Sequence, residues 1–348
     1  MKFLVLICFL FFLPGCMVGY FFKSSYHQQK LLRSRVAISE VLEDEKTPLE
    51  VKTKLQLAMN AKFFAEKELG LNKSKNYSSY VSLERPYVTW IVRASKAFEL
   101  EAYQWWFPIV GHVPYKGYFS ESEAQEEATT FDKKKYDIYV RGVTAYSTLG
   151  WFDDPITSPM LRYNDHDLVE LIIHESVHAT LYIKSNAEFN ERLATFLGQE
   201  GAKLFYQKLE GQDSQNLKAI NDNIEDTKLF SNFISKELED LRKWYVSLPD
   251  TNKNVVEKYK RIKNIQIRFA ANIKPLLKTE SFKNFDQREL NNAMLLSYET
   301  YIQDLSDFEK LFQLENKNLK NFLNRIKSLE EVDNPQDQLK AWIALNTH

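Results

Sequence analysis

The sequence has little cysteine, little glycine and almost no net charge, and each shortage excludes a class of protein. Its 348 residues include two cysteines, Cys8 and Cys16, so no disulfide can form in the body of the fold. The formal net charge of −1 gives no electrostatic reason to expect a nucleic-acid partner. Only ten glycines occur, and long stretches lack both glycine and proline, which predicts a helix-rich protein. The 44% hydrophobic content is ample for a core and excludes a disordered chain.

The amino terminus has the pattern of a targeting signal. An apolar run at residues 3–13 fits the central region of a signal peptide better than a membrane span. The run ends in Leu13-Pro14-Gly15-Cys16, which resembles a bacterial lipobox, although Pro14 departs from the usual pattern. We therefore predict a lipoprotein signal peptide at residues 1–15 and lipidation of Cys16.

An uncleaved membrane anchor is the alternative, because no charged residue occurs at positions 3–22. Both interpretations attach the protein to a membrane. For a lipoprotein the body lies outside the cytoplasm, in the bacterial cell envelope, and on the outer membrane if the organism is Gram-negative.

The most informative stretch is residues 168–201, which contains His174-Glu175-Ser176-Val177-His178. On a helix, residues four apart point the same way, so the two imidazoles can bind one Zn²⁺. Glu175 between them can act as general base toward the attacking water. Apolar residues surround the motif on nearly every side, which predicts a buried helix beginning at Asn164 or Asp165.

A third metal ligand is expected from a second helix that returns over the first. Residues 184–187 form a polar break, and Asn186 is a candidate cap for the next helix. We predict Glu191 as the oxygen ligand, which leaves a fourth position open. A third histidine ligand is excluded, because that pattern requires glycine and histidine where the chain has Leu181 and Lys184. Two other acidic residues of the returning helix remain alternatives: Glu188 and Glu200.

Around this stretch the chain resembles a bacterial family of predicted zinc aminopeptidases, many of whose members are lipoproteins. The residues that carry the resemblance are HESVHATLYIK followed by FNERLATFLGQEGAKLF. It covers roughly residues 15–310 and is most specific at 115–201, with further matching segments at 84–88, 107–111, 115–119, 143–155 and 290–293. The resemblance implies a zinc peptidase with a zincin-like fold, and aminopeptidase is the family's own predicted activity.

Several residues are candidates for contact with a peptide substrate. Tyr146 can donate a hydrogen bond to the oxyanion, and Asp153 or Asp154 can pair with a substrate α-ammonium. A packed tyrosine and an ordinary Asp-Asp-Pro turn are the alternatives. The resemblance also suggests that a helix around 287–305 closes over the cleft, with side chains facing the substrate that include Asn291, Tyr298 or Tyr301. A contact between helices is an equally open reading of the amides in that helix.

The fold class predicted is α+β, predominantly helical, with a small mixed sheet before the motif helix. Strands are expected near 87–93, 105–110, 113–119 and 136–140, and a helix at 120–134. Long amphipathic helices are expected at 215–246 and 250–278, another at 308–329, and a frayed end over the last fifteen residues. The predicted segments are a signal peptide (1–15), a membrane-proximal helical hairpin (16–79), a catalytic core (80–210) and a helical carboxy-terminal part (211–348).

The function predicted is that of a membrane-tethered zinc peptidase with one Zn²⁺ per chain and a peptide substrate. Aminopeptidase action is preferred to endopeptidase action. Two alternatives from other classes are a non-catalytic scaffold that binds partners through its long helices and a structural envelope lipoprotein whose motif is accidental. The side-chain specificity, natural substrate, protein partners and oligomeric state do not follow from the sequence.

Overall fold

The computed structural model describes residues 15–108, 111–145, 152–184, 186–249, 253–301 and 304–346. Helices predominate among them and the strands form small sheets, which confirms the expected predominantly helical α+β class.

The amino-terminal helices pack against different parts of the fold. Helix α2 (Gly15–Arg33) lies along the sheet, where Tyr20 donates a hydrogen bond to the carbonyl of Gly117 at 2.8 Å. Helix α4 (Leu49–Lys67) packs against the helix that carries the histidine motif. Between them are the short strand β1 (Val36–Ala37) and helix α3 (Ile38–Glu43). The first helix of the expected hairpin is therefore interrupted, because β1 pairs with β2 (Ser79–Val81).

The strands form three small sheets within the described residues. The largest is antiparallel, with order β6-β3-β7, and consists of Lys116–Tyr118, Thr89–Lys96 and Tyr136–Val143. The second is the hairpin of β4 (Trp105–Phe107) and β5 (Gly111–Val113). The third contains β1, β2 and β8 (Ile156–Thr157), with β2 and β8 parallel. The strands predicted near 87–93, 105–110, 113–119 and 136–140 overlap β3, β4, β6 and β7, whereas β1, β2 and β8 were not predicted. The expectation that the strands join into one mixed sheet was wrong.

One face of the β6-β3-β7 sheet is covered by α5 (Glu121–Thr129). Alternate residues of β3 point to this side, where Trp90, Val92 and Ala94 pack in an apolar cluster with Ala124. The alternation leaves the opposite face of β3 and β7 directed away from α5.

The motif helix and the returning helix form as predicted. Helix α6 (Asp165–His178) begins after Asn164, and helix α7 (Ala187–Glu210) begins after Asn186. Leu168, Val169 and Ile172 of α6 are fully buried in the main hydrophobic core. The same core includes residues of α4, α7 and the last helices of the chain, so segments distant in sequence are packed together. The predicted division into four segments stays a prediction.

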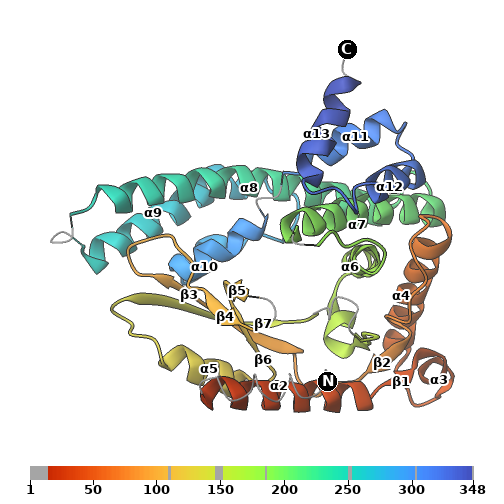
Figure 1. Ribbon diagram of the computed structural model, residues 1–348, viewed down its shortest axis with the longest axis horizontal. Helices are drawn as coiled ribbons and strands as arrows, with labels where there is room; N and C mark the ends of the chain where they lie inside the picture. Colours follow the sequence, from red (N-terminus) through yellow and green to blue (C-terminus); the bar gives the residue numbers. More distant parts are fainter. Residues whose placement is uncertain are drawn as a thin grey trace.

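A long helical pair follows. Helices α8 (Gln215–Ser247) and α9 (Val255–Asn272) are joined by a short connection and lie side by side (Figure 1). A second apolar core between them consists of residues at three- and four-residue steps, including Phe230, Ile234, Leu238, Ile262, Ile265 and Phe269.

The carboxy-terminal helices are shorter than predicted. The expected helix at 287–305 is instead α10 (Asn292–Ser297) followed by a 3₁₀ turn (Tyr298–Tyr301), because the side chain of Asn291 caps α10. The expected helix at 308–329 is divided into α11 (Ser306–Leu314) and α12 (Leu319–Lys327). Asn316 and Lys317 adopt positive φ angles of 54° and 57° between them, which ends a helix.

The expected frayed end was also wrong for the residues described. Helix α13 (Pro335–Leu345) begins with a side-chain cap from Asn334, and Leu339 is fully buried in the main core. A buried apolar side chain and a satisfied cap together keep this last helix folded.

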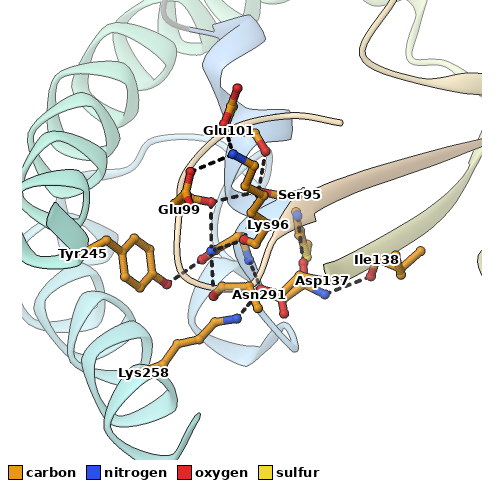
Figure 2. A network of polar contacts seen from close by, with 12 residues as sticks. Ser95, Lys96, Glu99, Glu101, Asp137, Ile138, Tyr245, Lys258 and Asn291 are labelled. Carbon is orange, nitrogen blue, oxygen red and sulfur yellow. Dashed lines mark hydrogen bonds and ion pairs between the residues drawn. The ribbon is translucent and has the colours of Figure 1, made fainter. Parts of the chain in front are cut away.

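A polar network fastens α10 and the long helical pair to the sheet (Figure 2). The side-chain amide of Asn292 donates to the carbonyl of Lys96 at 2.9 Å and accepts from the Tyr245 hydroxyl at 2.8 Å. Asp137 of β7 pairs with Lys258 of α9 at 2.5 Å and accepts from the backbone N–H of Asn292 at 2.8 Å. Lys258 is buried and the Asp137 side chain is 10% exposed, so removal of one partner would leave the other charge largely shielded from water and unpaired.

In the view of Figure 1, α2 and α5 are drawn below the sheet, and α8 and α9 above it. Helix α6 lies beside the sheet, with α7 running over it. None of the helices in the described part of the chain combines the length and the apolar character needed to cross a membrane.

Candidate metal centre

Three predicted ligands converge where α7 passes over α6. His174 Nε2 and His178 Nε2 lie 3.1 Å apart. The Glu191 carboxylate approaches both rings, with one oxygen 3.6 Å from His174 Nε2 and the other 3.4 Å from His178 Nε2. Among the described residues this is the one group of three or more His, Cys, Asp or Glu side chains that could hold a metal ion.

These separations fit the coordination of Zn²⁺. Bonds of about 2.0–2.2 Å in a tetrahedral site place neighbouring ligand atoms roughly 3.3–3.6 Å apart. The three observed separations, 3.1, 3.4 and 3.6 Å, are close to these values. Two imidazoles and one carboxylate are also a donor set that zinc sites of peptidases use. The residues present therefore fit a bound zinc ion.

The two acidic alternatives to Glu191 are placed elsewhere. Glu188 is exposed in the first turn of α7, and Glu200 forms an ion pair with Lys203 at 2.6 Å. Of the three candidates, Glu191 alone reaches both histidines in the part of the chain that the structure describes.

Gly198 allows α7 to approach the histidines closely. A Cβ atom at this position would lie 3.2 Å from the Glu170 carbonyl oxygen and 3.3 Å from His174 Cβ. Those distances are shorter than ordinary van der Waals contact, so a larger residue would have to push the two helices apart.

Asn190 fixes the connection between α6 and α7. Its side chain accepts a hydrogen bond from the Ile183 N–H at 2.9 Å and donates one to the Ile183 carbonyl at 2.8 Å. Asn190 is buried and immediately precedes Glu191, so the two hydrogen bonds fix the position of the backbone that carries the Glu191 side chain. Sequence reasoning missed both Asn190 and Gly198, since their roles depend on contacts between helices.

The charges at the centre stabilise one another. Burial lowers the pKa of His178, but the Glu191 carboxylate raises it more, so the net shift is upward. The neighbouring imidazoles of His174 and then His178 hold the pKa of the Glu191 carboxyl well below its usual range. The carboxyl of Glu191 is therefore an anion at neutral pH, as an oxygen ligand to a cation must be.

Glu175 has a carboxylate oxygen that is buried without a hydrogen-bond partner among the described residues. A carboxylate oxygen in this state is costly unless a ligand or water supplies the missing donor. The pKa of Tyr77 is raised well above its usual value, first by burial of the Tyr77 ring and then by the negative charge of Glu175. His178 Nδ1 is likewise buried and unpartnered within the described residues, so the outer hydrogen bond typical of a histidine ligand is not made by them.

The other predicted site residues lie in different environments. Asp153 is exposed, and its carbonyl accepts from the Arg35 guanidinium at 2.8 Å. Asp154 is buried, and its charge also raises the pKa of Tyr77. Tyr146 and the side chain of Cys16 lie outside the described residues.

Asn291 and Tyr298 have contacts within the fold. Asn291 caps α10 and donates to the Ile138 carbonyl at 2.9 Å (Figure 2). Tyr298 is buried in the core of the long helices, with its ring 5.3 Å from that of Phe230. These contacts agree with the alternative that the two residues have structural roles within the fold. A role of either residue in substrate binding stays a prediction.

A comparison with protein families gives one match. The family model described as "Putative aminopeptidase" matches residues 19–341. The chain belongs to this family. Membership supports a peptidase function at a coarse level and agrees with the resemblance drawn from the motif. No curated protein and no solved structure matches the chain.

Proposed function

We propose that this member of the aminopeptidase family is a zinc-dependent peptidase that hydrolyses peptide bonds. The observation that carries the proposal is the convergence of His174, His178 and Glu191 at separations suited to one zinc ion. These three residues would hold the ion. When bound, zinc supplies a Lewis acid that polarises the scissile carbonyl and increases the acidity of water.

Glu175 acts as the general base in this proposal. Its buried, unpartnered oxygen accepts a proton from the attacking water and then delivers that proton to the leaving amine nitrogen. One side chain therefore serves both proton transfers, and no other acid is required from the described residues. Oxyanion stabilisation by Tyr146 remains part of the proposal on the sequence alone, because this residue lies outside the described residues.

Aminopeptidase action is proposed on the family membership alone. Asp153 or Asp154 would pair with the substrate α-ammonium in this proposal. Peptides with acetylated amino termini test this point: an aminopeptidase leaves them uncut, and efficient cleavage would indicate an endopeptidase.

The metal site is tested by the zinc content of the purified full chain. We expect about one zinc per wild-type chain and much weaker retention by Glu191→Ala, because only two ligands would remain. Glu188→Ala is the matched control, since it removes an exposed carboxylate one turn earlier on α7. Equal zinc content in all three proteins, or none in a folded wild type supplied with zinc, would refute the site.

The catalytic role is tested with Glu175→Gln. We expect this variant to keep its zinc and lose hydrolysis by about 10²–10⁴-fold, the usual contribution of a general base. Full zinc-dependent activity in Glu175→Gln would exclude Glu175 as the base.

We further propose that the protein is attached to a membrane through a lipid on Cys16. The lipobox-like sequence is the only support for this proposal. Mass spectrometry of the amino-terminal peptide distinguishes a lipidated Cys16 from an intact Met1, which would indicate the uncleaved anchor instead.

A further inference from the structure

A cavity of about 850 Å³ adjoins the metal centre and includes Glu191 in its lining. Its lining also includes residues of the β6-β3-β7 sheet and, from α2, Tyr20 and Ser24. The volume is within the range of pockets that take small-molecule ligands. A substrate held at the metal centre would extend into this cavity.

The sheet lines the cavity with its face opposite α5. In β3 and β7, Ile91 pairs with Arg141, and Arg93 pairs with Tyr139. Arg93 and Arg141 therefore occupy diagonal positions on one face, roughly 7–8 Å apart at the backbone. Both arginines line the cavity.

Neither arginine has an ion pair within the described residues. Arg93 Nε is buried without a hydrogen-bond partner, and its guanidinium lies 5.7 Å from the centre of the Tyr115 ring. Glu191 is the only acidic side chain in the described lining of the cavity, and it is already engaged by the two histidines.

The two positive charges act on each other. Burial lowers the pKa of the Arg93 guanidinium, and the like charge of Arg141 lowers it further. Glu299 opposes this shift, but it is itself paired with Arg242. An anion bound between the two guanidinium groups would relieve their repulsion and supply the acceptor that Arg93 lacks.

We propose that Arg93 and Arg141 bind a carboxylate of the peptide substrate. The proposal rests on the proposed peptidase function and adds a substrate class to it. A peptide carboxylate comes from two sources: the α-carboxylate of a short peptide, or an acidic side chain of a longer one. Planar guanidinium groups bind either through paired N–H donors.

The test compares three peptides of one length that differ only in the placement of negative charge. One has a free terminal carboxylate, one has a terminal amide, and one has a terminal amide and an aspartate as its last residue. We expect wild-type KM for at least one carboxylate peptide to be about tenfold or more below that of the neutral amide. The free-acid and aspartate peptides identify which source the subsite prefers.

Arg93→Gln and Arg141→Gln should abolish this preference by raising KM for the carboxylate peptide about tenfold, to the value for the neutral amide. Arg261→Gln is the control, because it removes the same charge from α9, away from the cavity. Arg141→Glu should invert the preference toward a peptide whose last residue is lysine. Equal loss on charged and neutral peptides, or a wild type without any preference, would overturn the subsite.

Calorimetric titration of the same peptides into the full-length protein separates this proposal from the proposed function. If wild type cleaves no peptide, the peptidase proposal fails. A carboxylate peptide that still binds more tightly than its amide, with the difference lost in the Arg93 and Arg141 variants, supports the subsite alone. Equal affinities for the acid, the amide and the aspartate peptide refute it.

Discussion

Gly198 of α7 lies against His174 of α6, at a position where an added Cβ would be 3.3 Å from His174 Cβ. The close approach brings the helix that carries Glu191 over the helix that carries both histidines. The geometry of the candidate metal ligands therefore depends on the absence of a side chain at one position, which is a relationship between helices rather than a feature of the HExxH motif.

Gly198→Ala should weaken zinc binding by separating α6 from α7. Overpacking costs about 1–3 kcal/mol, part of which the roughly 1 kcal/mol helical preference of alanine offsets. We expect a zinc affinity about tenfold lower, measured by competition with a chelator, as for other changes that displace a metal ligand.

Gly201→Ala is the control for this prediction. An added Cβ there would be 2.9 Å from Leu69 Cδ1 and 3.0 Å from Ile173 Cγ2, so it meets side chains that are not candidate metal ligands. It should lower the unfolding free energy without a matching loss of zinc affinity. If the two alanine variants bind zinc equally well, close approach at Gly198 does not set the ligand geometry.

Asn190→Ala should destabilise the connection before α7. The variant leaves the N–H and carbonyl of Ile183 without these partners. The unfolding free energy should fall by roughly 1–3 kcal/mol for each buried group that stays unsatisfied. Urea unfolding of the metal-free protein measures the change. Asn186→Ala removes only a side-chain hydrogen bond to the Lys184 carbonyl and should cost about 0.5 kcal/mol or less. Similar values for the two variants would contradict the role given to Asn190.

Glu127 should make the stability of the sheet depend on acid pH. Burial raises the pKa of its carboxyl, but hydrogen bonds donated by Tyr118, Lys116 and Trp105 outweigh burial and lower the pKa below its usual value. A lowered folded-state pKa stabilises the fold above the unfolded pKa, and the contribution is lost as pH falls through the folded value.

Glu127→Gln should therefore lower the unfolding free energy at pH 7 by about 1.5–3 kcal/mol for each charged hydrogen bond that is weakened. The difference in unfolding free energy between Glu127→Gln and wild type should become smaller below about pH 4.5, where the carboxyl becomes protonated in the unfolded chain. Denaturant unfolding between pH 3 and pH 7 measures both. Glu126→Gln on the exposed side of α5 is the control, and a gap that does not change with pH would contradict the prediction.

The sequence predicted what local spacing determines. His174 and His178 share a face because of helical periodicity, and the polar break before Asn186 marked the turn to α7. Glu191 followed from that turn, since only a few residues of a returning helix can pass over the histidines. Local rules were sufficient to bring these side chains together because all three candidate ligands come from a segment of eighteen residues.

Contacts between distant segments were beyond the same rules. Asn291 and Asn292 stood out in the sequence, but their partners in the sheet are more than 150 residues away. Arg93 and Arg141 were not singled out, because only the strand register places them on one face. The break at Asn316 and Lys317 was also missed, since lysine rarely adopts a positive φ angle.

The position of helix α2 has a further consequence, because the helix both includes Cys16 in its first turn and lines the cavity beside Glu191. If Cys16 carries the lipid, the cavity wall begins at Tyr20, roughly 6 Å further along the helix at 1.5 Å per residue. Shedding by a protease that cuts after α2 would then remove that wall together with the anchor. The released body would diffuse away with an incomplete cavity. The proposed activity would therefore stay confined to the surface where the protein is attached.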